Sequence, residues 1–426
     1  MSLIVQKYGG SSVSDAAAIR RVAERVVKAR QAGNDVVVVV SAMGDTTDEL
    51  LDLAAAVTTT PPTRELDILL SAGERISMSL LAMAINERGI PAQSFTGQQA
   101  GLHTDEVYGR ARIISVSPER IADALGSGSV AIVAGFQGVN RQKNDVTTLG
   151  RGGSDTSAVA FAAALGADVC EIYTDVDGVF TADPRIVRTA KKVDQISYDE
   201  MLEMAASGAK VLQARCVEYA RRTGVPVHVR SSFSDLPGTL VTANGPSDAE
   251  GNKVEQPIIA GVAHDRSEAK ITVVAVPDIP GKAAHIFDIV ATSGANIDMI
   301  VQNVSIAATG LTDISFTLPA ADAPLAMAAL TDAQGDIGYE SLQFDDTIGK
   351  LSLIGAGMKS HPGVSARLFR ALAEAGVNIE MITTSEIRIS VVTRADELDD
   401  AVRAVHSAFD LDSENGEAVV YGGTGR

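Results

Sequence analysis

Residues 147–157 read Thr-Thr-Leu-Gly-Arg-Gly-Gly-Ser-Asp-Thr-Ser, and they combine three glycines with an arginine and a carboxylate. Glycine lets backbone N–H groups approach a ligand closely, and the apolar run that follows predicts a helix whose N-terminus favours anions. The guanidinium of Arg151 can hold a carboxylate or a phosphate through two parallel hydrogen bonds. We therefore predict an anion-binding loop; a glycine-rich connector with a solvated arginine is the alternative.

A second candidate for an anion-binding loop lies at the N-terminus, in the segment Lys7-Tyr-Gly-Gly-Ser-Ser12. It follows an apolar strand at 3–5 and precedes apolar residues at helical spacing between Ile19 and Val27. A strand, a Gly-Gly turn and a helix form a phosphate-binding geometry, although neither the P-loop spacing nor a Gly-x-Gly-x-x-Gly pattern is present. Lys7 is placed to reach a phosphate held there; a surface lysine in a tight turn is the alternative.

The composition limits the possible partners and the compartment. The chain has 426 residues, enough for about two or three domains. Its 36 Lys and Arg against 54 Asp and Glu give a formal charge of −18, which argues against nucleic acid or an anionic membrane as a partner. Two cysteines, scattered histidines and the lack of an 18-residue apolar run or signal-peptide pattern predict a cytoplasmic protein without a protein-ligated metal or a membrane span.

Apolar runs and helical patterns alternate along the first part of the chain. We expect strands at 36–40, 130–134, 169–173 and 225–229, and helices at 49–57, 76–86, 156–165 and 201–219. This alternation predicts an α/β catalytic domain over residues 1–243, built around a mostly parallel sheet. The polar segment 244–257, which carries Gly and Pro, indicates an interdomain linker.

Beyond the linker the chain repeats itself at a fixed offset. Pro280-Gly281 recurs as Pro362-Gly363, and Gly294-Ala-Asn-Ile-Asp-Met-Ile300 recurs as Gly376-Val-Asn-Ile-Glu-Met-Ile382, both 82 residues later (363 − 281 and 378 − 296). Each copy predicts a strand, a helix from the Pro-Gly turn, a second strand entered at Asn-Ile, and a third strand. Such units form small open sheets that usually pack in pairs, and we place them at 258–343 and 344–426. A duplicated structural domain without a ligand is the alternative.

Several motifs, in their order along the chain, resemble the aspartokinase branch of the amino acid kinase family. These motifs are Lys7-Tyr-Gly-Gly-Ser-Ser12, Ser41-Ala-Met-Gly-Asp-Thr-Thr47, Gly73-Glu-Arg-Ile-Ser77, Thr148-Leu-Gly-Arg-Gly-Gly-Ser-Asp155, Tyr173-Thr-Asp-Val-Asp-Gly-Val-Phe-Thr-Ala-Asp-Pro-Arg185 and Gly208-Ala-Lys-Val-Leu212. The two repeats resemble ACT domains. The resemblance implies an amino acid kinase-type α/β sandwich with a mostly parallel central sheet, followed by two ferredoxin-like α+β domains.

The resemblance also implies an activity: transfer of phosphate from ATP, with Mg²⁺, to the β-carboxylate of L-aspartate. The implied catalytic residues are Lys7, Glu74 and Asp155. The implied ATP-binding residues are Lys7, Tyr8, Gly9, Gly10, Ser41, Ser154, Thr174, Asp175, Phe180, Arg185, Lys210 and Val211. The implied aspartate-binding residues are Thr47, Glu74, Arg151, Gly152, Gly153, Ser154 and Asp155. The alternative roles are structural: a helix cap for Glu74, turn formation for Asp175 and Asp177, solvation for Arg185, and core packing for Phe180.

The chemistry agrees with this implied reaction. A β-carboxylate has a pKa near ~4 and is ionised at pH 7, so no strong general base is needed. Catalysis then depends on positioning and on neutralising charge, for which Lys7 and Lys210 supply fixed cations. Two rival functions remain: a kinase of the same fold acting on carbamate, UMP, glutamate or N-acetylglutamate, and an amino-acid-binding regulatory protein with an inert kinase half.

The resemblance to ACT domains implies amino-acid effectors bound near each Pro-Gly turn. The implied effector-site residues are Asp278, Pro280, Gly281, Asn296, Ile297 and Gln302 in the first copy, and Gly363, Val364, Asn378, Ile379, Thr384, Ser385 and Glu386 in the second. Two sites per chain predict joint inhibition by lysine and threonine, with lysine alone as the alternative. Pairing of ACT domains implies a homo-oligomer.

Overall fold

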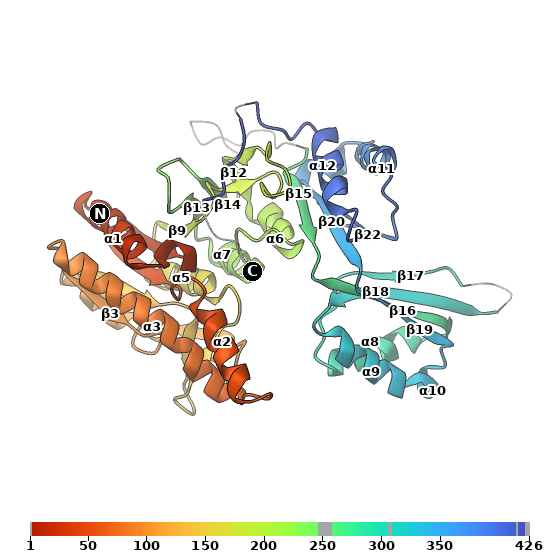
Figure 1. The fold of residues 1–426 in the computed structure, drawn as a ribbon, viewed down its shortest axis with the longest axis horizontal. Coiled ribbons are helices and arrows are strands. Elements are labelled where there is room, and N and C mark those ends of the chain that lie inside the picture. The colour runs from red at the N-terminus through yellow and green to blue at the C-terminus, as the bar shows by residue number, and fades with distance from the viewer. Residues whose placement is uncertain (1, 246–257, 306–308, 415, 422–426) are drawn as a thin grey trace.

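The computed structural model describes residues 2–245, 258–305, 309–414 and 416–421. Most of the expected linker, from 246 to 257, therefore lies outside the described residues. The described chain forms an α/β half and a C-terminal half that contains two smaller sheets (Figure 1).

The N-terminal half is built around one eight-stranded sheet. In spatial order its strands are β12 (Gln195–Ser197), β14 (Thr239–Thr242), β13 (Val227–Ser231), β9 (Val169–Thr174), β1 (Leu3–Tyr8), β2 (Asp35–Val40), β6 (Val130–Ala134) and β3 (Ala92–Phe95). Neighbouring strands are parallel except β13 and β14. The expected mostly parallel sheet is thus confirmed.

Helices cover both faces of this sheet. They are η1 (Gly10–Val13), α1 (Ala16–Gln31), α2 (Thr46–Val57), α3 (Thr63–Glu87), α4 (Glu119–Gly126), α5 (Gly153–Leu165), α6 (Tyr198–Ala206) and α7 (Ala214–Thr223). Alternate valines of β2 divide between the two layers: Val36, Val38 and Val40 pack with α1 and α3, whereas Val37 and Val39 pack with α5 and α7. A strand that is buried on both faces has a continuous apolar sequence, which explains the five consecutive valines of β2.

The N-terminal half also contains two small sheets. The first contains β5 (Ile113–Val116), β4 (Leu102–Thr104), β7 (Gln137–Asn140) and β8 (Val146–Thr148) in that order, and we call it the flap sheet. The second pairs β10 (Val179–Phe180) with β11 (Lys192–Val193). Both lie in segments that connect strands of the main sheet.

The helix expected at 201–219 is wrong, because the chain forms two helices there, α6 and α7, separated by residues 207–213. Gly208 breaks the helix with a φ of +108°. A Cβ at this position would lie 2.0 Å from the carbonyl oxygen of His264, a residue beyond the linker. The break therefore depends on a close approach that local periodicity does not report.

The C-terminal half contains two four-stranded sheets with helices packed on them. The first sheet has the order β17 (Ile300–Gln302), β18 (Leu311–Pro319), β16 (Glu268–Pro277) and β19 (Ser341–Asp345), with α8 (Lys282–Thr292), α9 (Ala323–Asp332) and α10 (Gln334–Ile337). The second has the order β15 (Gly261–Asp265), β20 (Ile348–Ile354), β22 (Arg388–Arg394) and β21 (Met381–Thr384), with η2 (Ala356–Ser360), α11 (Val364–Glu374) and α12 (Leu398–Ala408).

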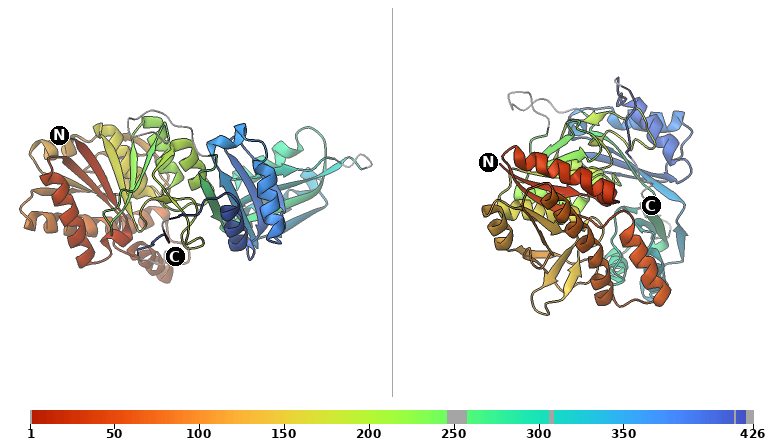
Figure 2. Two further views of the ribbon diagram at one scale, coloured as in Figure 1. Left: turned by 90° about the horizontal axis from the view of Figure 1, so that it is seen from above. Right: turned by 60° about the vertical axis from the view of Figure 1, so that its left-hand side comes forward.

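The strand pairing crosses the expected boundary between the two repeats. β15 lies in the range expected for the first repeat, yet it pairs antiparallel with β20 of the second sheet (Figure 1). The chain thus forms one strand of the second sheet, β15, then all four strands of the first sheet, and then the remaining strands of the second sheet. The segment that follows α12 also crosses to the α/β half, where Asp412 and Val420 form bridges with Ala190 and Val176 (Figure 2).

The second strand of each repeat begins later than expected. Asn296-Ile297 and Asn378-Ile379 lie in connecting segments, and the strands start at Ile300 and Met381. In both repeats the isoleucine of this pair packs against the hydrophobic core of its own domain. Apolar packing, rather than strand pairing, explains these isoleucines.

Reciprocal ion pairs join the two C-terminal domains. The Lys350 ammonium lies 2.6 Å from the Asp298 carboxylate of the first repeat and also contacts Glu268, and Lys270 of the first repeat contacts Glu380 of the second. Asp298 and Glu380 occupy equivalent positions after Asn-Ile, 82 residues apart. Each repeat therefore supplies a lysine to the acidic residue that follows Asn-Ile in the other.

α3 is long and apolar enough, by length and composition alone, to cross a membrane. However, 56% of its apolar window is buried inside the protein, where it packs against α1 and the main sheet. A core helix of a globular domain passes the same test, so this helix is weak evidence for a membrane span.

Candidate active site

The two predicted anion-binding loops converge at the carboxyl ends of the central parallel strands. The segment after β1 is held against the segment after β2, because the Ser41 N–H donates to the Tyr8 carbonyl at 3.0 Å and the Gly44 N–H donates to the Gly10 carbonyl at 3.1 Å. A Cβ on Gly10 would lie 2.8 Å from the carbonyl oxygen of Gly44, so only glycine permits this approach. Ligands of open α/β sheets bind at this edge.

Lys7 and Asp155 meet in this crevice. Lys7 extends from β1 toward the N-terminus of α5, and its Nζ lies 2.6 Å from Asp155 Oδ1, with the two side chains 13% and 9% exposed. A Cβ on Gly9 would lie 3.4 Å from the same Nζ, which places the ammonium over the Gly-Gly turn. The first turn of α5 adds N–H groups that have no partner within the helix. The arrangement offers a cation and backbone donors to a phosphoryl group.

Glu74 lies on α3 and is 2% exposed. Its Oε1 accepts a hydrogen bond from the Ala42 N–H at 3.1 Å, while its Oε2 is buried without a hydrogen-bond partner among the described residues. Burial raises the pKa of this carboxyl to about 7, although the hydrogen bond from Ala42 lowers it. Glu74 lies in the interior of α3 and does not cap it. A buried carboxylate oxygen without a donor is suited to a cationic ligand.

The loop before α5 is shaped by glycine. Gly152 caps the helix with a φ of +71°, and a Cβ there would lie 1.8 Å from Gln213 Cγ. Gly153 and Ser154 are buried in the first turn. Arg151 differs from them, because its side chain is 86% exposed and reaches only to 3.9 Å from Asp48 of α2. Thr47 lies half-buried in the first turn of the same helix.

The other residues predicted for ATP gather around one cavity of about 330 Å³. Those that line it are Thr174, Asp175, Phe180, Arg185, Lys210 and Val211. The Arg185 guanidinium lies 3.1 Å from Asp175 Oδ2, so it is paired with a carboxylate at the rim. Phe180 is buried but faces the cavity, and Lys210 reaches it from the break between α6 and α7.

The Tyr8 side chain lies in the core rather than in the crevice, so only its backbone remains beside the predicted phosphate loop. Its side chain is fully buried, it stacks on Tyr173 at a centroid distance of 4.7 Å, and its hydroxyl donates to Gln6. Burial raises the pKa of the Tyr8 phenol well above its ordinary value. Neighbouring strand residues face opposite sides of a sheet. Because the Lys7 side chain faces the crevice, the Tyr8 side chain packs in the helix-covered core.

Sequence reasoning missed one wall of the cavity predicted for the nucleotide. Val262, Ala263 and His264 line it, and they belong to β15. The Val262 N–H donates to the Thr181 carbonyl at 2.7 Å, which holds this strand against the segment that carries Phe180. Because β15 also pairs with β20, one strand contacts both the cavity and the second C-terminal sheet.

The predicted effector residues divide between two further cavities. One of about 330 Å³ is lined by Asp278, Pro280, Gly281 and Gln302. The other, of about 660 Å³, is lined by Gly363, Val364, Thr384, Ser385 and Glu386. Asn296, Ile297, Asn378 and Ile379 line neither cavity, and the two isoleucines pack instead against the hydrophobic cores of their domains.

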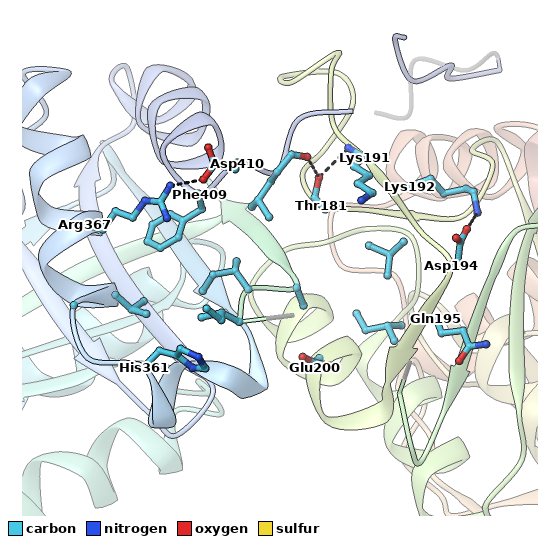
Figure 3. A pocket seen from close by; sticks show the side chains of 18 of the residues that line it. Thr181, Lys191, Lys192, Asp194, Gln195, Glu200, His361, Arg367, Phe409 and Asp410 are labelled. Carbon is cyan, nitrogen blue, oxygen red and sulfur yellow. Dashed lines mark hydrogen bonds and ion pairs between the residues drawn. The ribbon is translucent and has the colours of Figure 1, made fainter. Parts of the chain in front are cut away.

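A cavity of about 1040 Å³ lies between the α/β half and the second C-terminal domain (Figure 3). His361, Arg367 and Asp410 approach it from one side, and Lys192 and Glu200 approach it from the other. Gly363 and Val364 line this cavity as well as the second effector cavity. The start of α11 thus stands between an effector cavity and the gap between domains.

No group of three or more His, Cys, Asp or Glu residues suited to a metal ion occurs among the described residues. Mg²⁺ commonly binds through substrate phosphates, one or two carboxylates and water rather than through a protein cage. Asp155 and Asp175 are the predicted site residues with carboxylates near the phosphate crevice and the nucleotide cavity. A magnesium ion carried by the nucleotide fits this arrangement.

Comparison with known proteins identifies the class. The sequence model of the amino acid kinase family matches residues 2–231, and that of the ACT domain matches residues 271–334 and 351–409. Since the first match covers more than half of the chain, the chain belongs to the amino acid kinase family, and its C-terminal sheets belong to ACT domains.

More similar relatives narrow this assignment. The chain is 62% identical over 426 residues, 100% of both chains, to an aspartokinase of Mycolicibacterium smegmatis. It resembles E. coli aspartokinase III in complex with aspartate and ADP (R-state) with a TM-score of 0.82, at 27% identity over 95% of this chain and 99% of that one. The same protein in complex with lysine and aspartate (T-state) gives a TM-score of 0.70, at 27% identity over 96% and 99%. The chain therefore belongs to the aspartokinases.

Proposed function

We propose that this aspartokinase transfers the γ-phosphoryl group of ATP to the β-carboxylate of L-aspartate and releases L-4-aspartyl phosphate and ADP. This reaction would open the route to lysine, threonine and methionine. The observation that carries the proposal is that the Lys7–Asp155 pair and the buried, partly unpartnered Glu74 carboxylate both lie at the joined segments that follow β1 and β2. The E. coli structure with aspartate and ADP supports the same pair of ligands.

The chemistry requires charge neutralisation more than proton transfer. The attacking β-carboxylate has a pKa near ~4, so it is ionised without a base at pH 7. Lys7 approaches the transferred phosphoryl group and stabilises the charge that develops on it. Bound Mg²⁺ would supply further neutralisation of the phosphate oxygens. Gly9, Gly10, Ser41 and Ser154 would face the triphosphate.

Recognition of aspartate needs one group for each of its charges. We assign the ammonium to Glu74 and Asp155, and the α-carboxylate to Arg151. Arg151 is exposed, and its nearest carboxylate among the described residues is Asp48 at 3.9 Å, so it is free to swing toward a substrate. Thr47, Gly152, Gly153 and Ser154 would complete the pocket. Thr174, Asp175, Phe180, Arg185, Lys210 and Val211 would hold the nucleotide.

ADP release with different acceptors separates the rival functions. We expect release with L-aspartate and none with carbamate, UMP, glutamate or N-acetylglutamate. Release with one of these instead would assign the chain to another kinase of this fold. Absence of release with every acceptor, together with binding of amino acids, would identify a regulatory protein with an inert kinase half.

The pKa of Glu74 predicts a pH-dependent affinity for aspartate. With a pKa of about 7, only about a tenth of the carboxyls are ionised at pH 6, whereas most are ionised at pH 8. The charged form attracts the substrate ammonium, so we expect KM for aspartate to rise about tenfold from pH 8 to pH 6. Initial rates over this range would measure the change.

Glu74→Gln is the control for this titration. Its KM for aspartate should be high and nearly constant over the same range. Stability supplies a second check: the folded-state pKa lies above the ordinary 4.5, so the protonated form favours the fold. Without substrate, the Tm of wild type relative to Glu74→Gln should therefore fall between pH 5 and pH 8. A flat KM in wild type would remove Glu74 from ammonium recognition.

Gly208 predicts how strongly the nucleotide cavity depends on the break between α6 and α7. In Gly208→Ala the new Cβ would meet the His264 carbonyl oxygen at 2.0 Å, so the loop or β15 must shift. We expect KM for ATP to rise at least about fivefold and Tm to fall. Gly224→Ala is the matched control, because Gly224 also has a positive φ but no described atom within 4 Å of its Cβ position. Equal KM for ATP in both variants would contradict this prediction.

We also propose that lysine and threonine together inhibit the enzyme through the ACT domains, with lysine alone as the alternative. The E. coli structure with lysine supports an amino-acid effector. Two features support coupling to catalysis: β15 contacts both the nucleotide cavity and β20, and the start of α11 separates an effector cavity from the gap between domains. An effector that binds one arrangement better would shift the population toward it.

Asp278→Ala should separate inhibition from catalysis. Asp278 lines the first effector cavity and can accept a hydrogen bond from an effector ammonium. We expect uninhibited kcat to stay within about twofold, while inhibition weakens by roughly 5–150-fold. Inhibition curves with lysine, threonine and methionine, alone and in pairs, would measure this, with Asp288→Ala on the exposed side of α8 as control. Normal inhibition of Asp278→Ala would exclude the proposed site.

Assembly and location follow from the same proposal. ACT domains pair through their sheets, so we propose a homo-oligomer joined by these domains. The strong negative charge and the low cysteine content support a cytoplasmic location.

A further inference from the structure

A buried carboxylate outside the predicted site anchors the flap sheet to α3. Asp67 is 1% exposed. Its Oδ2 accepts hydrogen bonds from the Thr148 N–H at 2.9 Å and the Gly109 N–H at 3.0 Å, and its Oδ1 accepts from the Thr148 hydroxyl at 2.7 Å and the Gly109 N–H at 3.0 Å. A charge is seldom buried unless it is fully hydrogen-bonded, and here the donors come from two separate flap segments.

Both of these segments adjoin the arginine loop. Thr148 ends β8 and is followed directly by Leu149-Gly150-Arg151. The Gly109 carbonyl faces Gly150 so closely that a Cβ there would lie 3.1 Å away. Arg215 supplies a second anchor by donating to the Leu149 carbonyl at 3.0 Å. The loop that carries Arg151 therefore begins at Thr148, and Asp67 fixes the position of Thr148.

Asp67 also lies on the same helix as Glu74, seven residues earlier. Seven residues are about two helical turns, or about 10.5 Å, so the two side chains share one face of α3. One rigid helix thus carries the carboxylate assigned to the substrate ammonium and the carboxylate that fixes the base of the α-carboxylate loop. The spacing between the two recognition groups is set by this helix.

We propose that Asp67 is a positioning residue for aspartate, acting through Thr148 on the loop that carries Arg151. The inference rests on the proposed function. It differs from a purely structural role, because it predicts a loss confined to one substrate. Loss of the anchor lets the loop drift from the position in which Arg151 meets the α-carboxylate, while the nucleotide cavity is built from other segments.

Asp67→Asn tests this proposal. The amide that replaces the carboxylate turns an NH₂ group toward N–H and O–H donors, so at least one of the four hydrogen bonds is lost while the shape is kept. We expect KM for aspartate to rise at least about tenfold and KM for ATP to stay within about twofold. Rates are measured well below the Tm of each variant.

Asp145→Asn is the matched control. Asp145 also joins the flap to α3, through Arg64 at 2.8 Å, and it accepts a hydrogen bond from the Tyr108 hydroxyl, but its side chain does not bond the Thr148 and Gly109 donors that Asp67 holds. Its KM for aspartate should stay within about twofold of wild type. If Asp67→Asn does not fold, Thr148→Val carries the test, since it removes only the hydroxyl donor and should raise KM for aspartate about threefold.

The outcomes are distinct. A rise in KM for aspartate alone supports the proposal. A fall in Tm with both KM values unchanged, or an equal rise in both, overturns it and leaves Asp67 a structural residue. Absence of aspartate-dependent ADP release in wild type would instead overturn the proposed function itself.

Discussion

Lys7→Ala should lower kcat for aspartyl phosphate formation by at least ~100-fold, because one lost transition-state charge contact is worth roughly 3 kcal/mol. Lys7 is the cation that faces the Gly9-Gly10 turn, and its Nζ forms an ion pair with Asp155. Alanine would leave the Asp155 carboxylate in the crevice without its neutralising partner. That carboxylate would repel the triphosphate, so KM for ATP should also rise.

Lys28→Ala, on the exposed side of α1, serves as a control for a lysine far from the crevice. It should retain wild-type kcat. Circular dichroism and Tm would establish that Lys7→Ala is folded. Wild-type kcat in folded Lys7→Ala would remove Lys7 from the mechanism.

Arg151→Lys should raise KM for aspartate at least about tenfold, because lysine keeps the charge but loses the planar fork that binds a carboxylate by two hydrogen bonds. The side chain is 86% exposed, so its replacement should leave Tm nearly unchanged. KM for ATP should change by less than about twofold, since Arg151 does not line the nucleotide cavity.

Arg110→Lys is a suitable comparison, because Arg110 is exposed and lies beside Gly150. It should leave both KM values near those of wild type. If Arg151→Lys raises KM for ATP as much as KM for aspartate, then Arg151 serves the phosphates instead.

Local patterns predicted the central strands of the main sheet, β1, β2, β6, β9 and β13, and several of the helices that cover it. The valine run of β2 and the helix after Gly153 follow from apolar periodicity and composition alone. The convergence of the Lys7 and Arg151 loops depends on tertiary structure, because the Arg151 loop follows β8 of the flap sheet, which pairs antiparallel with β7, rather than a strand of the parallel sheet. Strand alternation would have placed the Tyr8 side chain in the core, since its neighbour Lys7 faces the crevice.

Other features depend on contacts between distant segments. Gly208 ends α6 because the His264 carbonyl, on the far side of the linker, occupies the space of a Cβ. β15 joins the second C-terminal sheet rather than the first, and no local pattern records which partner a strand will choose. In the sequence Asp67 is only a charged residue within an apolar helical pattern. Its hydrogen bonds form only when the flap sheet packs against α3, so no local pattern predicts them.

The most direct test of the central claim is to trap the product with hydroxylamine in a reaction containing ATP, Mg²⁺ and L-aspartate. An acyl phosphate on the β-carboxylate reacts with hydroxylamine to give aspartate β-hydroxamate, which mass spectrometry identifies. We expect this hydroxamate in amounts equal to the ADP released by wild type, and at least ~100-fold more slowly with Lys7→Ala. Release of ADP without hydroxamate, or formation of the α-hydroxamate, would contradict phosphorylation of the β-carboxylate.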